Sequence, residues 1–343
     1  MRIALDSTYS IGEHLSGVGV YSREILSGLP AQHREAHYRF YYRPHRFLRS
    51  FRETLPANCS RALLWGPPLG GRCDLFHGLN QRVDSKRAPR TVSTFHDLFV
   101  LTAEYSTPDF RRRFAAQARS AAERSDLIIA VSAFTAGQVH DLLGVERSRL
   151  RVVHHGVHLP PETRQPVQRE RLILFAGAIQ TRKNIARLVQ AFEPMPKGWK
   201  LVLAGSLGYG AAEILDRIAK SPRKPDIELT GYVSNQELQS LYARASIFAF
   251  PSLDEGFGMP VLEAMAWGTP VLTSNRSALP EISGDAALLV DPLDVHSIQA
   301  GLQRLVDDQE LRATVSARGR ELCRKFSWDS AVEKTWAVYQ ELL

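Results

Sequence analysis

The chain has 343 residues, of which 44% are hydrophobic and 23% are charged, a balance typical of a globular protein large enough for two domains. Its apolar runs are all shorter than the roughly 20 residues that cross a bilayer, and the first apolar run turns polar too early for a signal peptide. The cysteines, Cys59, Cys73 and Cys323, lack the spacing of a zinc site or a disulfide framework. We therefore expect a cytoplasmic protein.

The positive charge is concentrated in the first half of the chain. Residues 1–165 contain 23 Lys and Arg against 15 Asp and Glu, and residues 166–343 contain 20 against 21, which together give the net charge of +7. A basic surface attracts anions. The first half is therefore expected to contact a nucleic acid, a phosphate-bearing acceptor or an acidic membrane surface.

Short apolar runs rich in β-forming residues alternate with segments of helical periodicity, such as residues 110–125 and 211–220. Strands that alternate with helices form parallel sheets covered on both faces. Two series of such strands predict an α/β protein with two doubly wound domains. The first series is expected at residues 2–5, 75–77, 91–95, 127–130 and 152–154, and the second at 172–176, 200–204, 227–229, 247–250, 271–273 and 287–290.

A polar, proline-rich segment separates the two series. Residues 159–169 contain three prolines, which remove backbone donors and interrupt regular structure. We therefore predict an N-terminal domain at residues 1–160, a linker at 161–170 and a second domain at 171–326. Residues 327–343 begin with a serine suited to cap a helix and continue with apolar side chains at helical spacing.

The strongest local pattern lies between residues 250 and 270. An apolar strand leads into the sequence Glu255-Gly-Phe-Gly, and Pro260 suits the first turn of the helix that follows. Free amides at a helix N-terminus attract oxygen-rich or anionic ligands, and Gly256 and Gly258 let a ligand approach the backbone. Glu255 and Glu263 can face one crevice at the carboxyl edge of the sheet and accept hydrogen bonds from paired sugar or ribose hydroxyls. A solvated loop glutamate and a helix-capping carboxylate are the alternative interpretation.

Residues 255–271, EGFGMPVLEAMAWGTPV, closely resemble the signature of glycosyltransferase family 4. The resemblance extends over nearly the whole chain. It implies a retaining glycosyltransferase with the GT-B fold, in which two Rossmann-like doubly wound domains face a cleft, and it implies that residues 327–343 cross back to the first, acceptor-side domain. It also implies that Glu263 binds the ribose of a nucleotide-sugar donor and that Glu255 binds hydroxyls of the transferred sugar. Backbone amides would complete this donor site at Gly256, Phe257, Gly258 and Met259.

A second pattern joins a strand, a turn that contains Gly177 and a helix start that contains Arg182 and Lys183. Adjacent cations at a helix N-terminus suit a diphosphate, although such a pair alone is most often solvated surface. The segment resembles the diphosphate-binding loop of the family, in which Arg and Lys stabilise the leaving nucleotide. Because these charges can replace a metal ion, and no Asp-x-Asp occurs in a suitable context, we expect no metal and no cofactor.

Further positions take their roles from the same resemblance. His96 follows a predicted strand and matches a family histidine near the donor sugar, with a hydrogen-bonded structural histidine as the alternative. Gly17 and Gly19 resemble the N-terminal glycine loop beside the donor diphosphate and the acceptor, although an ordinary strand-to-helix turn would look similar. Val233 lies in a segment that resembles the family's nucleobase contact.

Basic and aromatic residues are dense at residues 38–52, and residues 111–114 add a second cluster in the same half of the chain. They could stack on nucleic acid, lie at an anionic bilayer, or include a strand whose arginines are solvated. Many members of the family extend glycans on lipid carriers, so the resemblance favours a membrane surface and no nucleic-acid partner. The candidate acceptor or membrane residues are Arg43, Arg46, Arg49, Arg111, Arg112 and Arg113.

We therefore predict a hexosyltransferase that uses a nucleotide-sugar. Residues 95–98 and 273–281 resemble bacterial mannosyl- and rhamnosyltransferases of polysaccharide assembly, which favours GDP-mannose as the donor. The acceptor would be a glycan or a lipid-linked saccharide of the lipopolysaccharide type, met at the inner face of the cell membrane. A UDP-, ADP- or dTDP-sugar donor, or an epimerase of nucleotide-sugars, remains the alternative. A dinucleotide-dependent oxidoreductase would need a complete glycine fingerprint and a following acidic residue, which we do not find.

Overall fold

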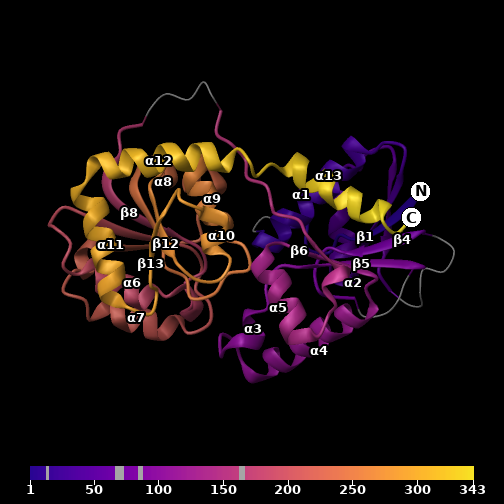
Figure 1. Ribbon diagram of the computed structural model, residues 1–343, viewed down its shortest axis with the longest axis horizontal. Helices are drawn as coiled ribbons and strands as arrows, with labels where there is room; N and C mark the ends of the chain where they lie inside the picture. The colour runs from indigo at the N-terminus through magenta and orange to yellow at the C-terminus, as the bar shows by residue number, and fades with distance from the viewer. Residues whose placement is uncertain (13–14, 66–72, 84–87, 162–166) are drawn as a thin grey trace. The chain divides into compact units, whose positions relative to one another are not determined.

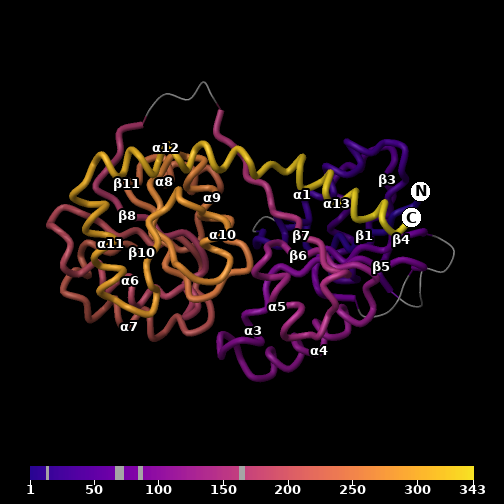
Figure 2. The backbone as a smooth tube through the Cα atoms, viewed as in Figure 1, coloured from indigo at the N-terminus to yellow at the C-terminus, as the bar shows by residue number. Residues whose placement is uncertain are grey.

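The computed structural model describes residues 1–12, 15–65, 73–83, 88–161 and 167–343 (Figures 1 and 2). It divides into two compact units. The first unit combines Met1–Gly156 with Ser327–Leu343, and the second is Val157–Phe326. The chain thus passes from one unit to the other at residues 156–157 and returns at residues 326–327.

The first unit is built on one parallel sheet in the order β3-β2-β1-β4-β5-β6-β7. Figure 1 shows α1 (Gly17–Gln32) and α13 (Trp328–Gln340) on one face and α4 (Pro108–Arg124) and α5 (Ala133–Leu143) on the other. The strands are β1 (Arg2–Asp6), β2 (His37–Tyr42), β3 (Cys59–Leu63), β4 (Leu75–Gly78), β5 (Arg90–Phe95), β6 (Leu127–Ala130) and β7 (Leu150–Val152). Short helical turns are α2 (Pro44–Phe47), η1 (Leu48–Arg52), α3 (Phe99–Thr102) and η2 (Arg147–Arg149).

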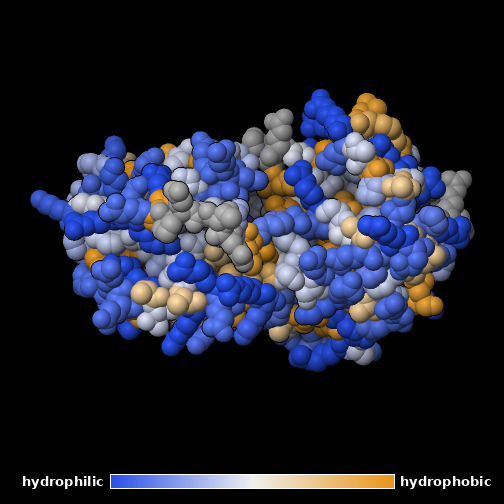
Figure 3. Space-filling view, turned by 90° about the horizontal axis from the view of Figure 1, so that it is seen from above, coloured by the Kyte–Doolittle hydropathy of each residue, from blue (hydrophilic) through white to orange (hydrophobic). Residues whose placement is uncertain are grey.

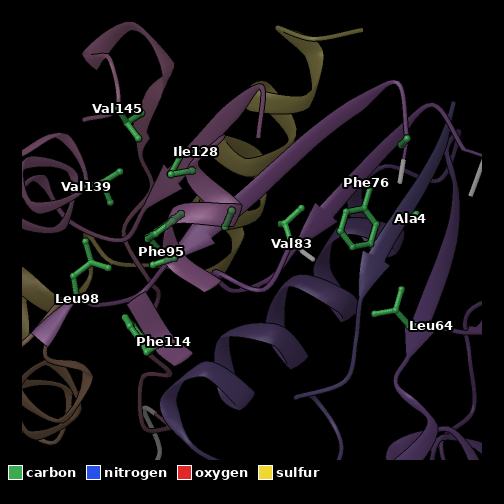
Figure 4. Packing of buried hydrophobic residues seen from close by; sticks show 14 of the residues in the cluster. Ala4, Leu64, Phe76, Val83, Phe95, Leu98, Phe114, Ile128, Val139 and Val145 are labelled. Carbon is green, nitrogen blue, oxygen red and sulfur yellow. The ribbon is translucent and has the colours of Figure 1, made fainter. Parts of the chain in front are cut away.

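Local sequence signals fix where these helices begin and end. Ser16, Thr107 and Ser132 each accept a backbone N–H in the first turn of α1, α4 and α5. Gly144 ends α5 in the left-handed conformation, at φ 69°. The apolar faces of α4 and α5 then pack on the sheet (Figure 4), where Phe114 and Val139 meet Phe95 and Ile128 in one buried cluster.

The C-terminal helix α13 belongs to the core of the first unit. The Tyr339 hydroxyl lies 2.6 Å from His77 Nδ1, and His77 Nε2 lies 2.8 Å from the Thr94 hydroxyl. The Trp336 ring stacks on His33 with 4.0 Å between centroids. All of these side chains except Trp336 and His33 are fully buried, so α13 completes the sheet's covering rather than lying on its surface.

The second unit has a parallel sheet in the order β10-β9-β8-β11-β12-β13. Its strands are β8 (Glu170–Ala176), β9 (Lys200–Ala204), β10 (Ile227–Gly231), β11 (Ala245–Phe250), β12 (Val271–Ser274) and β13 (Leu288–Val290). Figure 1 shows α6, α7 and α11 on one face and α8, α9 and α12 on the other. The helices are η3 (Thr181–Lys183), α6 (Ile185–Phe192), α7 (Ala211–Ala219), η4 (Lys224–Asp226), α8 (Asn235–Arg244), α9 (Met259–Ala266), α10 (Leu279–Ser283), α11 (Val295–Asp307) and α12 (Gln309–Cys323).

The predicted α/β fold with two doubly wound parallel sheets is confirmed. The strand expected at residues 152–154 is misplaced, because the chain leaves the sheet after Val152 and His155 packs against the Tyr21 ring at 4.9 Å. The edge strand β3 was not predicted. Residues 162–166 of the expected linker lie outside the described residues, and Glu170, its last residue, already belongs to β8.

Residues 38–42 form part of β2, and the rings of Tyr38, Tyr41 and Tyr42 are buried within the unit. The strand that one interpretation expects at residues 38–42 is therefore confirmed. No helix in the described part of the chain is long and apolar enough to cross a membrane. The face seen in Figure 3 is mostly hydrophilic, with hydrophobic side chains scattered across it.

The strand order creates one point in each sheet where the direction of winding reverses. In the first unit the chain builds outward from β1 to β3 and then from β4 to β7, so the reversal lies between β1 and β4. In the second unit it lies between β8 and β11. Open α/β sheets bind ligands beyond the carboxyl ends of the strands at such points. These two places are where functional side chains are expected.

Candidate active site

The loop after β8 positions two cations. Arg182 and Lys183 lie in the short helix η3, and Asn184 follows in the left-handed conformation at φ 61°. The Asn184 side chain donates hydrogen bonds to the carbonyl oxygens of Pro251 at 3.0 Å and Pro292 at 2.7 Å. The asparagine therefore anchors the cationic turn to the loops that follow β11 and β13.

The loop after β11 brings a carboxylate to these cations. Glu255 Oε2 lies 3.0 Å from the Arg182 guanidinium, and Glu255 Oε1 lies 2.5 Å from Lys183 Nζ. The Ser252 hydroxyl donates to the same Oε1 at 2.5 Å. Arg182 is also bonded to the backbone oxygen of Asp254. The three charged side chains are each less than a tenth exposed, so they form a buried cluster with one positive charge in excess.

The electrostatics of the cluster keep Glu255 ionised. Burial by itself would raise the pKa of its carboxyl group, but the charges of Arg182 and Lys183, together with hydrogen bonds from Lys183 and Ser252, lower that pKa to about 2. Lys183 Nζ also lies 4.7 Å from the centre of the Phe250 ring. A carboxylate bound to two cations at the winding reversal of a parallel sheet is suited to hold hydroxyl and phosphate groups of a ligand.

The glycine-rich loop leads from this cluster into α9. Gly258 has φ 109°, and a Cβ at this position would lie 2.7 Å from the side chain of Leu279, so only glycine fits without strain. Phe257 is buried and meets Phe326 edge-on at 6.1 Å. Gly256 precedes this anchor, and Met259 begins α9. The backbone of residues 256–259 is thus held at the helix N-terminus, as the pattern predicts.

Glu263 lies within α9 but has a different partner from Glu255. Its Oε2 accepts a hydrogen bond of 2.9 Å from the Tyr242 hydroxyl of α8. Burial raises the pKa of its carboxyl group, against smaller lowering effects of the Tyr242 hydrogen bond and the charge of His158. Glu263 is therefore oriented by Tyr242, a contact that the sequence pattern does not reveal.

Two other predicted donor positions lie on neighbouring loops of the second unit. Gly177 follows β8 with φ 143°. It lies so close to Gly205 that a Cβ added to Gly205 would fall 1.9 Å from the Gly177 carbonyl oxygen. Val233 is half-buried between β10 and α8, next to Ser234, which forms a capping box with Glu237. The described geometry brings Arg182, Lys183 and Glu255 into direct contact and leaves Val233 outside that cluster.

The glycine loop of the first unit begins α1. Gly17 is exposed and is the first residue of the helix, and the Gly19 N–H donates to the Ser16 hydroxyl at 3.4 Å. A Cβ on Gly19 would lie 2.9 Å from the Tyr9 carbonyl oxygen. Gly19 is therefore needed for the close passage of two backbone segments at the carboxyl end of β1.

His96 is a buried member of an aromatic cluster in the first unit. Its Nε2 lies 2.9 Å from the Leu79 carbonyl oxygen, and its ring stacks on His155 at 5.4 Å and meets Tyr21 edge-on at 4.8 Å. Burial lowers the pKa of His96 to about 4, although the bond to Leu79 acts in the opposite direction. These contacts fit the structural interpretation of this histidine and keep it neutral near pH 7.

Four of the six candidate arginines contact carboxylate or carbonyl groups of the first unit. Arg43 lies 3.7 Å from Asp6, and Arg46 donates to the Ile11 carbonyl oxygen at 3.2 Å. Arg111 pairs with Glu104 at 3.0 Å, and Arg112 pairs with Asp109. Arg49 and Arg113 are exposed, and no ion pair to either is present among the described residues.

Three polar residues at the second-unit site were missed from the sequence. Asn184 anchors the cationic turn, Ser252 binds Glu255 and Tyr242 orients Glu263. The spacing of Ser252 three residues before Glu255 is a usable signal for a turn contact, whereas Tyr242 could be found only from the packing of α8 on α9. Within the described ranges, no three His, Cys, Asp or Glu side chains gather as a metal-ion site.

Comparison with known families covers both halves of the chain. The family described as Glycosyltransferase Family 4 matches residues 8–159, and the one described as Glycosyl transferases group 1 matches residues 161–322. The two matches contain the glycine loop of α1 and the whole buried cluster around Glu255, respectively.

Several relatives are named mannosyltransferases. The chain is 33% identical over 284 residues to O-antigen chain mannosyltransferase B of Escherichia coli, which covers 78% of this chain and 74% of that protein. It is 29% identical over 275 residues to the serotype-specific mannosyltransferase WbdA of Escherichia coli, covering 74% of this chain and only 34% of that protein. The chain therefore spans about a third of the length of WbdA.

Solved structures show the same fold at low sequence identity. Sucrose-phosphate synthase from Thermosynechococcus elongatus superposes with a TM-score of 0.81 at 19% identity over 99% of this chain and 98% of that chain. Anabaena HepE in complex with UDP-glucose superposes with a TM-score of 0.76 at 15% identity over 99% and 100%. With its two Rossmann-like units, the Glu255 signature and these relatives, the chain belongs to glycosyltransferase family 4 and is a glycosyltransferase of the GT-B fold.

Proposed function

We propose that this glycosyltransferase transfers mannose from GDP-mannose to a saccharide with retention of the anomeric configuration. The observation that carries the proposal is the buried cluster of Arg182, Lys183 and Glu255 at the winding reversal of the second sheet. The names of its relatives, O-antigen chain mannosyltransferase B and WbdA, support mannose as the sugar. Its lower similarity to HepE, solved with UDP-glucose, makes a UDP-sugar the first alternative to test.

The cluster supplies what departure of a nucleoside diphosphate requires. Arg182 offers a planar fork of donors and Lys183 a compact charge, and their summed charge exceeds that of Glu255 by one. Fixed cations in a site shielded from water stabilise the charge that develops on a leaving diphosphate, so no metal ion is required for that step. The acceptor hydroxyl would attack on the face from which the diphosphate leaves, and the diphosphate would accept its proton.

The remaining donor contacts follow from the loops of the second unit. Glu255 would bind hydroxyls of the sugar, together with the backbone amides of residues 256–259. Glu263, oriented by Tyr242, would accept hydrogen bonds from the ribose hydroxyls. Gly177 would keep the turn after β8 narrow beside the diphosphate, and the backbone around Val233 would contact the base. In the first unit, Gly17 and Gly19 would border the diphosphate and His96 the sugar.

The acceptor is proposed to be a growing polysaccharide or a lipid-linked saccharide at the inner face of the cell membrane. Beyond the name of its O-antigen relative, the support is a basic, apolar surface around η1. Leu48 and Phe51 are 81% and 60% exposed there, beside the exposed Arg49. Flotation with vesicles that contain anionic lipid should carry the protein, and Arg49→Gln with Phe51→Ser should reduce that binding. Equal binding to neutral vesicles, or none to either, would count against the membrane assignment.

Thermal denaturation in the presence of nucleotides tests the donor assignment. A ligand that binds only the folded protein raises its melting temperature. We expect a larger rise with GDP than with UDP, ADP or dTDP, and a much smaller rise in Arg182→Ala. Arg244→Ala removes an exposed ion pair with Glu170 on the same unit and serves as the matched control. A response to UDP alone would replace the donor, and no response to any nucleotide from folded protein would contradict the proposed site.

A further inference from the structure

The loop after β12 places a fourth polar side chain beside Glu255. The Ser277 hydroxyl accepts the Glu255 backbone N–H at 3.1 Å, and the Ala278 N–H donates to the Glu255 carbonyl oxygen at 3.2 Å. The same hydroxyl donates to the Arg276 carbonyl oxygen at 2.6 Å. Both backbone polar groups of Glu255 are therefore bonded to one short segment that begins 22 residues further along the chain.

Ser277 has an unusual backbone conformation. Its φ is 58°, in the left-handed region, and Asn184 is the one other described residue with a positive φ that is not glycine. A side chain in this region crowds the neighbouring carbonyl oxygen, and asparagine tolerates the conformation better than serine does. Such strained residues persist where the surrounding structure holds them, and they cluster at functional sites.

Both of these residues bond to the segment that carries Glu255. Asn184 donates to the Pro251 carbonyl oxygen at 3.0 Å, four residues before Glu255, and Ser277 accepts from Glu255 itself. Glycine occupies the other positive-φ positions of the described chain and would adopt either conformation without strain. We infer that these two positions require the hydrogen bonds of their side chains and not only the turn of the backbone.

The contact between Ser277 and Glu255 continues a row of hydroxyl bonds between two neighbouring loops. The Ser274 hydroxyl, at the end of β12, donates to the Ser252 carbonyl oxygen at 2.6 Å. The Ser252 hydroxyl in turn donates to Glu255 Oε1 at 2.5 Å. The loop after β12 thus fixes the loop after β11 at two points, and the second point is the residue whose carboxylate binds the two cations.

Capping of the next helix does not account for Ser277. Serine often precedes a helix because its hydroxyl can accept a backbone N–H of the first turn. The N-cap residue of α10 is Ala278, which makes no side-chain cap, and Ser277 lies one position earlier. Its hydroxyl accepts the N–H of Glu255 instead. The contact therefore acts on the Glu255 loop rather than on α10.

We propose that Ser277 is a positioning residue, which holds the backbone of Glu255 so that its carboxylate meets the transferred sugar in one fixed direction. The role toward the sugar rests on the function proposed above, whereas the bond to the Glu255 N–H does not. Arg182 and Lys183 belong to a separate turn, held by Asn184, so binding of the nucleotide itself would depend less on Ser277. The expected effect is on turnover and not on nucleotide affinity.

Three variants separate positioning from stability. Ser277→Ala removes the hydroxyl and keeps the backbone strain, whereas Ser277→Gly removes both, so Ser277→Gly should melt at a temperature no lower than Ser277→Ala. Both should nevertheless release GDP from GDP-mannose with kcat about tenfold below that of the native protein, with little change in KM or in the melting-temperature response to GDP. Ser221→Ala is the matched control, because it removes a hydroxyl that accepts the Arg223 N–H at 3.2 Å before β10. It should keep the native kcat.

Hydrogen exchange of the backbone tests the bond without any ligand. The Glu255 amide should exchange about tenfold faster in Ser277→Ala and Ser277→Gly than in the native protein, because its N–H loses the hydroxyl acceptor. Ser221→Ala should leave the exchange of this amide unchanged.

The outcomes separate this inference from the proposed function. Native kcat in Ser277→Gly, or an unchanged exchange rate of the Glu255 amide in Ser277→Ala, would overturn the positioning role. An equal loss of kcat in Ser221→Ala would overturn it as well, since turnover would then follow the general stability of the unit. Failure of the native protein to release nucleotide from any nucleotide-sugar would instead contradict the proposed function, and exchange of the Glu255 amide would still decide whether Ser277 holds this backbone.

Discussion

Replacing Glu255 by glutamine should destabilise the second unit strongly. The substitution keeps the size of the side chain and its contact with Ser252 but removes the carboxylate that binds both Arg182 and Lys183. Deleting one partner of a buried ion pair costs about 3–5 kcal/mol, because the remaining charges stay buried without compensation. The lowered pKa of Glu255, about 2 against an ordinary 4.5, corresponds to a similar preference of about 3 kcal/mol for the charged form.

Differential scanning calorimetry measures this effect. For a unit of 170 residues, from Val157 to Phe326, such a loss lowers the melting temperature by about 10 °C. Glu170→Gln, which breaks the exposed pair with Arg244, is the control and should change it by less than about 2 °C. A shift in Glu255→Gln no larger than in the control would refute the conclusion that the cluster is a buried, coupled ion pair.

An added anion should reverse part of the loss. In Glu255→Gln, Arg182 and Lys183 lose the Glu255 carboxylate, so inorganic pyrophosphate should raise the melting temperature of the variant more than that of the native protein. The substitution should also change how the unfolding free energy depends on pH under acidic conditions. Because folding lowers the pKa of Glu255, its contribution is complete above about pH 4.5 and disappears as the pH falls toward 2. The variant should lack this component in a titration of unfolding free energy.

Acid should also weaken the first unit, where burial lowers the pKa of His77 to about 3 and of His96 to about 4. The stability contributed by each neutral histidine is fully present above the unfolded pKa of about 6.5. Below that pH the unfolding free energy falls by about 1.4 kcal/mol per pH unit for each histidine. An unfolding free energy in urea that stays constant from pH 6.5 to 5 would contradict their burial as neutral groups. Tyr339→Phe removes the hydroxyl bonded to His77 and should lower the unfolding free energy by about 1–3 kcal/mol without changing the nucleotide response. Gly258→Ala, at φ 109°, should destabilise the second unit by about 1–2 kcal/mol in chemical denaturation and weaken nucleotide binding. Gly137→Ala, inside α5 with nothing within 4 Å of its added Cβ, should instead stabilise the first unit by about 0.5–1 kcal/mol, and a loss of stability would show that the site is not open.

The sequence predicts the residues of the proposed donor site better than their contacts. Glu255 and the pair Arg182 and Lys183 each stand out because a glycine turn and a helix start follow an apolar strand. Their ion pairs join Glu255 to residues 73 and 72 positions earlier in the chain. No local pattern encodes that distance. It follows from the pairing of β8 with β11, which sequence periodicity alone does not specify.

The first unit also contains features that its local sequence does not reveal. Strand β3 was missed because its residues are mostly half-exposed and include an arginine and a serine, so no apolar alternation marks it. A cavity of about 310 Å³ in the first unit, beside β1 and β4, was not predicted because its lining combines Tyr9, residues 80–82 and a face of α4. The sequence did contain one usable signal, the helical spacing of Phe110, Arg113, Phe114 and Gln117, which distinguishes Arg113 from its neighbours in the basic cluster.

The helix that completes the first unit is synthesised after the whole of the second unit. At about 5–20 residues per second, synthesis of the 170 residues from Val157 to Phe326 separates β7 from α13 by roughly 10–35 s. During that interval the buried His77 lacks the Tyr339 hydroxyl to which it is bonded in the folded unit. A nascent first unit therefore exposes an apolar face while the second unit folds, and shortened chains that end before α13 are expected to depend on chaperones and to be removed by proteases.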